Sequence, residues 1–216
     1  MPTRHYRHLY SVIGNSKLLK LQVIVLFLTT YIDWVLIPFI TKLEGMYLPV
    51  FMISFFMLIG ATDGLILPLF KKIRIYKIYL FVILLDLVQI LSYLLVNVDM
   101  PLFTYALLSV FTLQAITFEI SRVHTIDFMK DDIEIKDYLM LRSFVVSSAI
   151  IGGAISAMIL DYFEIDLEYI LLLLAVLGLF AIIIEYRLYA KFKKIVQKKR
   201  TIIQRQKTLL NEKINI

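Results

Sequence analysis

The feature that most constrains this chain is a series of long apolar runs separated by shorter, more polar segments. In a soluble helix the apolar residues recur along one stripe, whereas here they fill whole blocks, which is typical of segments surrounded by lipid. Of the 216 residues, 60% are hydrophobic, and a soluble domain of this length needs far more polar surface to cover itself. The sequence therefore predicts an all-α integral membrane protein, a polytopic helical bundle.

Hydropathy predicts six transmembrane helices, each long enough at about 1.5 Å per residue to cross a hydrocarbon core of about 30 Å. Residues 1–20 form a basic segment before this domain, which covers residues 21–187. Residues 188–216 form a basic tail, which is either an amphipathic helix or a partly disordered segment. The six predicted spans are 21–41, 46–70, 78–96, 102–121, 139–160 and 168–186.

The lysines and arginines assign the two sides of the membrane. Four precede the first span, four lie in KKIRIYK at 71–77, and ten run from Arg187 to Lys213. The three opposite loops hold Lys42 alone. Because basic loops stay in the cytoplasm, both termini are predicted to be cytoplasmic in a multi-pass protein of the inner or plasma membrane. Topology and attraction to anionic lipid account for the net charge of +6, so no nucleic-acid partner is predicted.

The residue types that usually carry chemistry are scarce. There is no cysteine, and His5, His8 and His124 do not have the spacing of metal ligands. No nucleophile-elbow or zinc-protease motif is present. No metal, cofactor or enzymatic activity is therefore predicted, although an active site within lipid stays open as an alternative.

Four stretches carry a resemblance when taken in order: TTYIDWVLIPFI at 29–40, LIGATDGLILPLFKKIRIYK at 58–77, residues 114–160, and within these SSAIIGGAISA at 147–157. They resemble helix one, the loop after helix two, and helices four and five of the major facilitator superfamily, a large group of secondary transporters. The likeness is to the N-terminal six-helix half of its efflux-type members.

The first two stretches show both the match and its departures. Ile32, Asp33 and Trp34 stand where efflux members often have Gly-Asp-Trp. Pro68 and Leu69 replace the acidic residue and the first arginine of the family's loop motif, so its charge latch is missing. The residues that match this motif are Gly64, Lys71, Lys72 and Arg74.

The resemblance implies a half-size secondary transporter. Family members have two six-helix halves with the substrate between them, whereas this sequence has one set of spans. It implies small-molecule efflux, with proton coupling as one option, by a homodimer or together with a second six-helix half. A truncated or repurposed relic is a further option. The alternative is a non-transporting immunity, assembly or accessory protein that binds another membrane protein, with the basic tail as its docking element.

The resemblance also implies a cavity and a gate. Helices one and four line the cavity in the family, which places Asp33 and Gln114 there, with Glu119 near its cytoplasmic end. Asp33 is a candidate proton or cation site, or else a hydrogen-bonding residue that fixes helix packing. Charged residues at the inner face are either a cytoplasmic gate or ordinary interfacial ion pairs. The proposed gate comprises Asp63, Arg122, Arg142, Lys71, Lys72 and Arg74.

Small residues predict surfaces where helix backbones approach closely. Two such rows occur, and each serves either a dimer contact or packing within the subunit. The two rows of small residues are Gly60 and Gly64 on helix two, and Ser148, Gly152 and Ser156 on helix five.

Asp86 lies in the middle of helix three, which the resemblance places at the periphery. Its side chain either turns inward with Gln89 and Ser92 or marks a protein interface.

Overall fold

The computed structural model describes residues 16–44, 73–97, 117, 120, 125 and 134–214. Every regular element in this part of the chain is helical. Four helices are long and apolar enough to cross a membrane. This part is all-helical, as the sequence predicts, and its composition suits a membrane bundle. The elements are α2 (Lys17–Glu44), α5 (Ile75–Ser92), the 3-10 helix η1 (Tyr93–Asn97), α7 (Ile135–Tyr162) and α8 (Leu167–Ile214).

Four of the six predicted spans coincide with these helices. The span predicted at 21–41 lies in α2, and the span at 78–96 lies in α5 and η1. The spans at 139–160 and 168–186 lie in α7 and α8. The remaining two, at 46–70 and 102–121, fall outside the described residues apart from Thr117 and Ile120.

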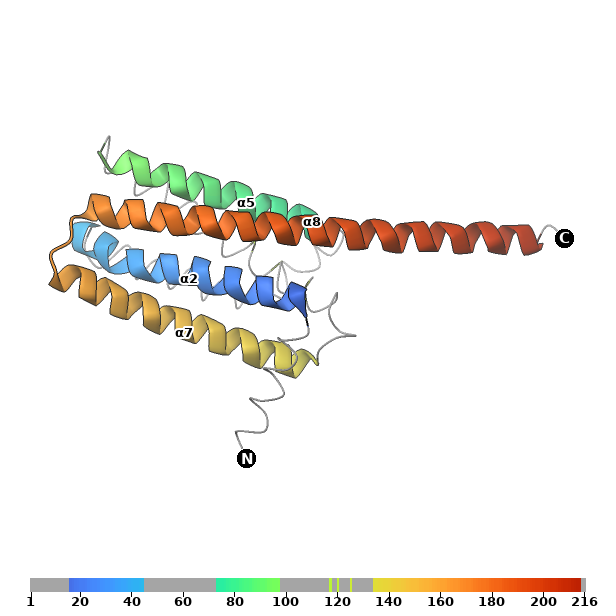
Figure 1. The fold of residues 1–216 in the computed structure, drawn as a ribbon, viewed down its shortest axis with the longest axis horizontal. Coiled ribbons are helices and arrows are strands. Elements are labelled where there is room, and N and C mark those ends of the chain that lie inside the picture. The colour runs from blue at the N-terminus through green and yellow to red at the C-terminus, as the bar shows by residue number, and fades with distance from the viewer. Residues whose placement is uncertain are drawn as a thin grey trace, which may run out of the picture.

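The helices form a row in which α8 packs between α5 and α2, and α2 packs between α8 and α7 (Figure 1). Helices α2, α5 and α7 begin at one end of the bundle, and α8 runs in the opposite direction (Figure 1). As a result, lysines at the starts of the first three helices share an end with the basic C-terminal part of α8. This arrangement agrees with helices that cross in alternating directions.

Helix α7 meets α2 through a row of buried residues spaced four apart. At its centre the backbones come very close, because a Cβ atom added to Gly153 would lie 2.9 Å from Trp34 Cβ and 2.9 Å from the Tyr31 carbonyl oxygen. Small residues permit this kind of close approach between membrane helices. The row consists of Leu141, Val145, Ala149, Gly153 and Ala157.

The predicted row of Ser148, Gly152 and Ser156 lies beside this buried row, one residue away. The Tyr31 hydroxyl donates a hydrogen bond of 2.7 Å to Ser156 Oγ, and a Cβ on Gly152 would rest 3.7 Å from the Tyr31 ring. Both residues therefore contact α2 of the same chain, which is the intrasubunit alternative. The other predicted row, Gly60 and Gly64, lies outside the described residues.

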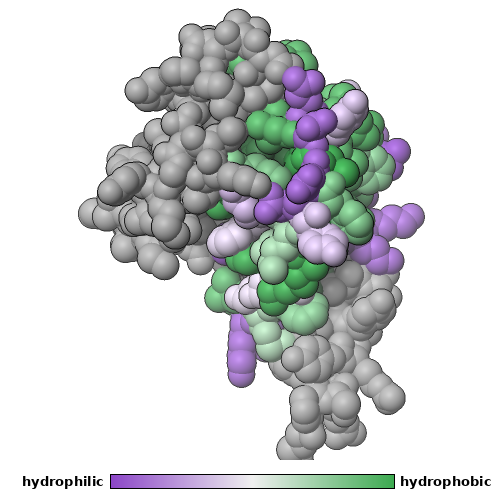
Figure 2. Space-filling model, turned by 90° about the vertical axis from the view of Figure 1, so that its left-hand side faces the viewer, coloured by the Kyte–Doolittle hydropathy of each residue, from purple (hydrophilic) through white to green (hydrophobic). Residues whose placement is uncertain are grey.

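A tight turn joins α7 to α8. The N–H of Glu164 donates to the Asp161 carbonyl at 3.0 Å, and the N–H of Ile165 donates to the Leu160 carbonyl at 3.1 Å. Together these bonds form a Schellman motif, with Glu164 in the left-handed conformation at φ 51°. Figure 2 looks onto this end of the bundle, where hydrophilic residues form a band across a largely hydrophobic surface.

Helix α8 is much longer than a bilayer requires. Its 48 residues span about 72 Å at 1.5 Å per residue. No glycine or proline occurs after Gly178, so nothing in the sequence breaks the helix before Ile214. The C-terminal part projects from the bundle as a straight continuation of the membrane-spanning part (Figure 1).

The close contact at Gly153 predicts that Gly153→Leu destabilises the pairing of α2 and α7 by about 1–3 kcal/mol, the usual effect of overpacking. Trp34 is the only tryptophan in the chain and lies at this contact, so its fluorescence reports on the pairing directly. The matched control is Gly152→Ala, because a methyl group there meets only an ordinary contact. Equal unfolding temperatures for the two purified variants would contradict the described interface.

Candidate functional site

The candidate site begins on the buried face of α5. Buried positions recur along this helix every three or four residues, and most of them are apolar. In the second half of the helix this face becomes polar: Asp86 is 4% exposed, Gln89 is 6% exposed and Ser92 is 2% exposed. Tyr93, the first residue of η1, continues the same face. Asp86 thus turns inward with Gln89 and Ser92, which is one of the two alternatives left open by the sequence.

Helix α2 contributes Asp33 to this polar face. Gln89 Nε2 donates a hydrogen bond of 3.1 Å to Asp33 Oδ1, which joins α2 to α5. Asp33 also lies within electrostatic range of Asp86. The Tyr93 side chain is buried close to both carboxyl groups. Asp33 is thus half-buried, and its predicted hydrogen bond to a neighbouring helix is present.

Helix α8 contributes a third carboxyl group, Glu185, opposite Asp86. The antiparallel register explains this placement: Tyr79 of α5 stacks on Phe192 of α8 with ring centroids 5.2 Å apart. Seven residues further along α5 and seven residues back along α8, the same face presents Asp86 and Glu185. The two carboxyl groups are close enough to interact electrostatically.

Glu185 is the most deeply buried charged residue in the described part of the chain, with an exposed fraction of 0%. Neither of its carboxyl oxygens accepts a hydrogen bond from an N–H or hydroxyl group of the described residues. No lysine or arginine is buried anywhere in that part of the structure. The neighbour that Glu185 faces is thus another acid.

The polar side chains form a chain through the bundle, which we call the acid layer: Glu185, Asp86, Gln89 and Asp33. Buried apolar clusters border it on both sides. On the side of the helix starts, the cluster comprises Val25, Ile75, Tyr79, Ile184, Leu188 and Phe192. On the side of the α7–α8 turn, it comprises Ile32, Val35, Leu36, Phe39, Tyr93, Ala157, Ile170, Leu171 and Leu174. The acid layer therefore lies between two apolar clusters along the described helices.

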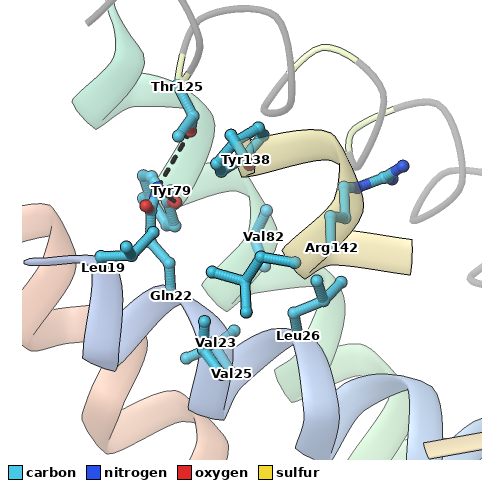
Figure 3. A pocket seen from close by; sticks show the side chains of 11 residues that line it. Leu19, Gln22, Val23, Val25, Leu26, Tyr79, Val82, Thr125, Tyr138 and Arg142 are labelled. Carbon is cyan, nitrogen blue, oxygen red and sulfur yellow. Dashed lines mark hydrogen bonds between the residues drawn. The ribbon is translucent and has the colours of Figure 1, made fainter. Parts of the chain in front are cut away.

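A small cavity of about 50 Å³ lies beyond the first of these clusters (Figure 3). Gln22 Nε2 donates to the Tyr79 hydroxyl and to Thr125 Oγ1, each at 2.9 Å, while Gln22 Oε1 has no partner among the described residues. At about 10–15 Å³ per water, the cavity holds a few waters. Arg142 lines its edge, with its guanidinium group directed away from the other labelled side chains (Figure 3).

The predicted site residues have different outcomes. Asp33 belongs to the acid layer, and Arg142 lies at the cavity. Arg74 occupies the N-cap position of α5 without a side-chain capping hydrogen bond, and it donates to the Tyr76 hydroxyl at 2.9 Å on the surface. The other predicted cavity and gate residues lie outside the described part of the chain: Gln114, Glu119, Asp63, Arg122, Lys71 and Lys72.

Glu185 is the member of the acid layer that the sequence reasoning missed. It stands one residue before the end of the span predicted at 168–186, where an acid is ordinary. A signal was nevertheless present: Ala181, Ile184, Leu188 and Phe192 continue a helical apolar stripe on both sides of it. All four are buried.

Comparisons of this sequence with protein-family models, with curated proteins and with solved structures found no match. Within the described residues, no group of three or more acidic or histidine side chains has the arrangement of a metal site. What the geometry offers is three carboxyl groups gathered inside the bundle, of which Asp33 accepts a hydrogen bond from Gln89.

The hydrogen bond between Asp33 and Gln89 predicts coupling in a double-mutant cycle. We expect Gln89→Leu and Asp33→Leu to interact by roughly 0.6–1.7 kcal/mol, the range found for hydrogen bonds between membrane helices. Unfolding in detergent micelles measures this coupling. The control combines Gln89→Leu with Gln22→Leu, whose hydrogen bonds go to other residues, and these two should be additive. Additivity of the Asp33 pair as well would contradict the bond.

Proposed function

We propose that this chain is a half-size secondary transporter of the inner or plasma membrane, which exports a small molecule in exchange for protons. It works as a homodimer or with a second six-helix half. The observation that carries the proposal is Asp33, an acid on the first long apolar helix that accepts a hydrogen bond from Gln89 of α5. Ionisable groups within membrane helices commonly mark proton relays and substrate pathways.

The surroundings of Asp33 support proton coupling. A carboxylate that serves only to fix packing is usually matched by a basic partner, since an unpaired buried charge is unfavourable. Here Asp33 accepts a hydrogen bond from the neutral side-chain amide of Gln89, and it lies near another acid, Asp86. Such an environment favours a group that gains and loses a proton during a working cycle.

The closed acid layer supports transport rather than a permanent channel. Apolar clusters border it on both sides along the helices, so it is not part of an open pore through the described helices. Alternating access in secondary transporters depends on a site that opens to one side at a time. The resemblance of residues 29–40 and 114–160 to the efflux family points in the same direction.

The second candidate is a non-transporting immunity, assembly or accessory protein. One observation favours it: α8 extends far beyond the length that a bilayer requires, and its C-terminal part is strongly basic. A projecting helix of this kind is suited to docking on another protein. In this alternative the acid layer serves only to hold the helices together.

Asp33→Asn separates these candidates, because asparagine can still accept the hydrogen bond of Gln89 but cannot carry a proton. Energised inverted vesicles that contain the wild-type chain should accumulate at least one small molecule several-fold from a metabolite extract, as read by untargeted mass spectrometry. We expect the variant to lose this accumulation at normal expression. Collapsing the pH gradient with nigericin should have the same effect.

The control variant is Glu168→Gln, which removes an exposed carboxylate at the start of α8 and should leave accumulation unchanged. Identical metabolite profiles for the wild type, Asp33→Asn and empty vesicles would contradict transport and favour the accessory protein.

A further inference from the structure

We propose that the C-terminal part of α8 is a docking surface for an acidic amphipathic helix of another protein. The surface is a stripe of apolar residues with basic residues along both of its edges. It gives the projecting helix a partner of defined chemistry, and it holds whether or not the chain transports a small molecule. The apolar residues, which we call the docking stripe, are Ile195, Val196, Ile202, Ile203, Leu209 and Leu210.

The docking stripe has a strict period of seven residues. Ile195, Ile202 and Leu209 are seven residues apart, and another apolar residue directly follows each of them. Because α8 is one continuous helix to Ile214, residues seven apart lie on nearly the same side of it, with a drift of about 20° per repeat. Apolar residues that keep this period over several repeats are typical of a helix that packs along a second helix.

Inside the bundle, the same side of α8 already packs on another helix. Leu188 and Phe192 are buried in a cluster with residues of α5, where the ring of Tyr79 stacks on that of Phe192. Val196, one turn further along α8, is half-buried against this cluster. Helix α5 begins at Ile75, and no other described helix lies beside the projecting part of α8 (Figure 1). The docking stripe thus continues a helix-packing face past its described partner.

Basic residues follow both edges of the docking stripe. The helical period of 3.6 residues places one basic row at each edge, both with the same seven-residue spacing. From residue 197 onward the opposite side of the helix is neutral, and Gln197 and Thr201 are exposed there. The charges therefore accompany the apolar residues and are not spread evenly around the helix. One row is Lys191, Lys198 and Arg205, and the other is Lys193, Arg200 and Lys207.

The charge of this part of α8 indicates the kind of partner. From Arg187 to Ile216 there are ten basic residues and one acid, Glu212. A second copy of the chain would bring the same excess of positive charge, and like charges that face each other between helices are unfavourable. Lys199 and Lys213 fall between the two apolar rows, where a carboxylate of the partner can pair with them. The partner that fits is a helix with an apolar stripe and with aspartates or glutamates in and beside it.

The membrane surface fits the docking stripe less well. The projecting part continues straight from the membrane-spanning part of α8, so its axis points away from the bilayer (Figure 1). Laying the stripe on lipid requires a sharp bend, which helices usually make at proline or glycine, and neither occurs after Gly178. Nucleic acid offers phosphates to the basic rows but no apolar surface to the isoleucines and leucines.

A synthetic acidic helix tests the docking surface. The probe is a fluorescent peptide of about four heptads, with isoleucine and leucine at its a and d positions and glutamate at e and g. We expect fluorescence anisotropy to show that it binds the full-length chain in phosphatidylcholine nanodiscs, and more weakly at high salt, because salt screens exposed charges. A peptide with lysine in place of glutamate should not bind. Lys198→Gln with Arg205→Gln should weaken both the binding and its dependence on salt.

Substitutions in the docking stripe should weaken binding, whereas equivalent substitutions on the opposite side should not. We expect Ile202→Gln with Leu209→Gln to lower the affinity by roughly tenfold or more, since two apolar side chains no longer bury their surface against the peptide. The matched control is Thr201→Gln with Thr208→Gln, which should keep the wild-type affinity. Glutamine is a good helix former, so both variants should stay helical, as circular dichroism can verify.

A nitroxide label distinguishes a protein-docking surface from a membrane-bound one. The chain has no cysteine, so Leu209→Cys provides a single labelling site in the docking stripe. In nanodiscs of phosphatidylcholine and phosphatidylserine, we expect the label to be relaxed by a water-soluble nickel chelate rather than by oxygen dissolved in the lipid.

The inference is overturned if the acidic peptide binds no more tightly than its lysine counterpart, or if Ile202→Gln with Leu209→Gln keeps the wild-type affinity. It is equally overturned if the label at Leu209→Cys lies in lipid, since the stripe then docks on the membrane. Normal peptide binding by a chain that fails to transport would leave the inference standing and reject only the proposed function.

Discussion

The structure depends on contacts between polar side chains on otherwise apolar helices, because each of these side chains needs a polar partner. Helix α5 is apolar on most of its surface, with Leu84 and Leu91 exposed on its outer side, so apolar packing alone fixes its rotation only weakly. Asp86 and Gln89 remove this freedom, because only one orientation brings them to Glu185 and Asp33. The same orientation places Tyr79 against Gln22 and Tyr93 in the outer apolar cluster.

Helix α2 makes two different kinds of contact with its neighbours. On one side it reaches α5 through the hydrogen bond of Asp33, and on the other it meets α7 through close packing at Gly153. The hydrogen bond is directional and tolerates some separation of the backbones, whereas the glycine contact requires the helices to touch. Helix α2 is thus held by a directional hydrogen bond on one side and by direct backbone contact on the other.

The sequence predicted the helices well and the site only in part. Long apolar runs identify a span without regard to its neighbours, so all four described spans were found. Asp33 was found because it is a lone acid in such a run. Glu185 was missed because hydropathy places it beside Arg187, at the edge of a span, and only the register with α5 shows what it faces. The predicted row of Ser148, Gly152 and Ser156 lies beside a second row that includes Ala149, Gly153 and Ala157, and sequence spacing does not say which of the two packs more tightly on α2.

The unbroken length of α8 has a mechanical consequence. Glu185 divides the helix into about 27 Å on the side of Leu167 and about 44 Å on the side of Ile214, at 1.5 Å per residue. A stiff rod that tilts by about 10° around Glu185 would move its far tip sideways by roughly 8 Å. Any repacking at this residue would therefore be amplified into a displacement that a binding partner could sense, with no flexible joint in between.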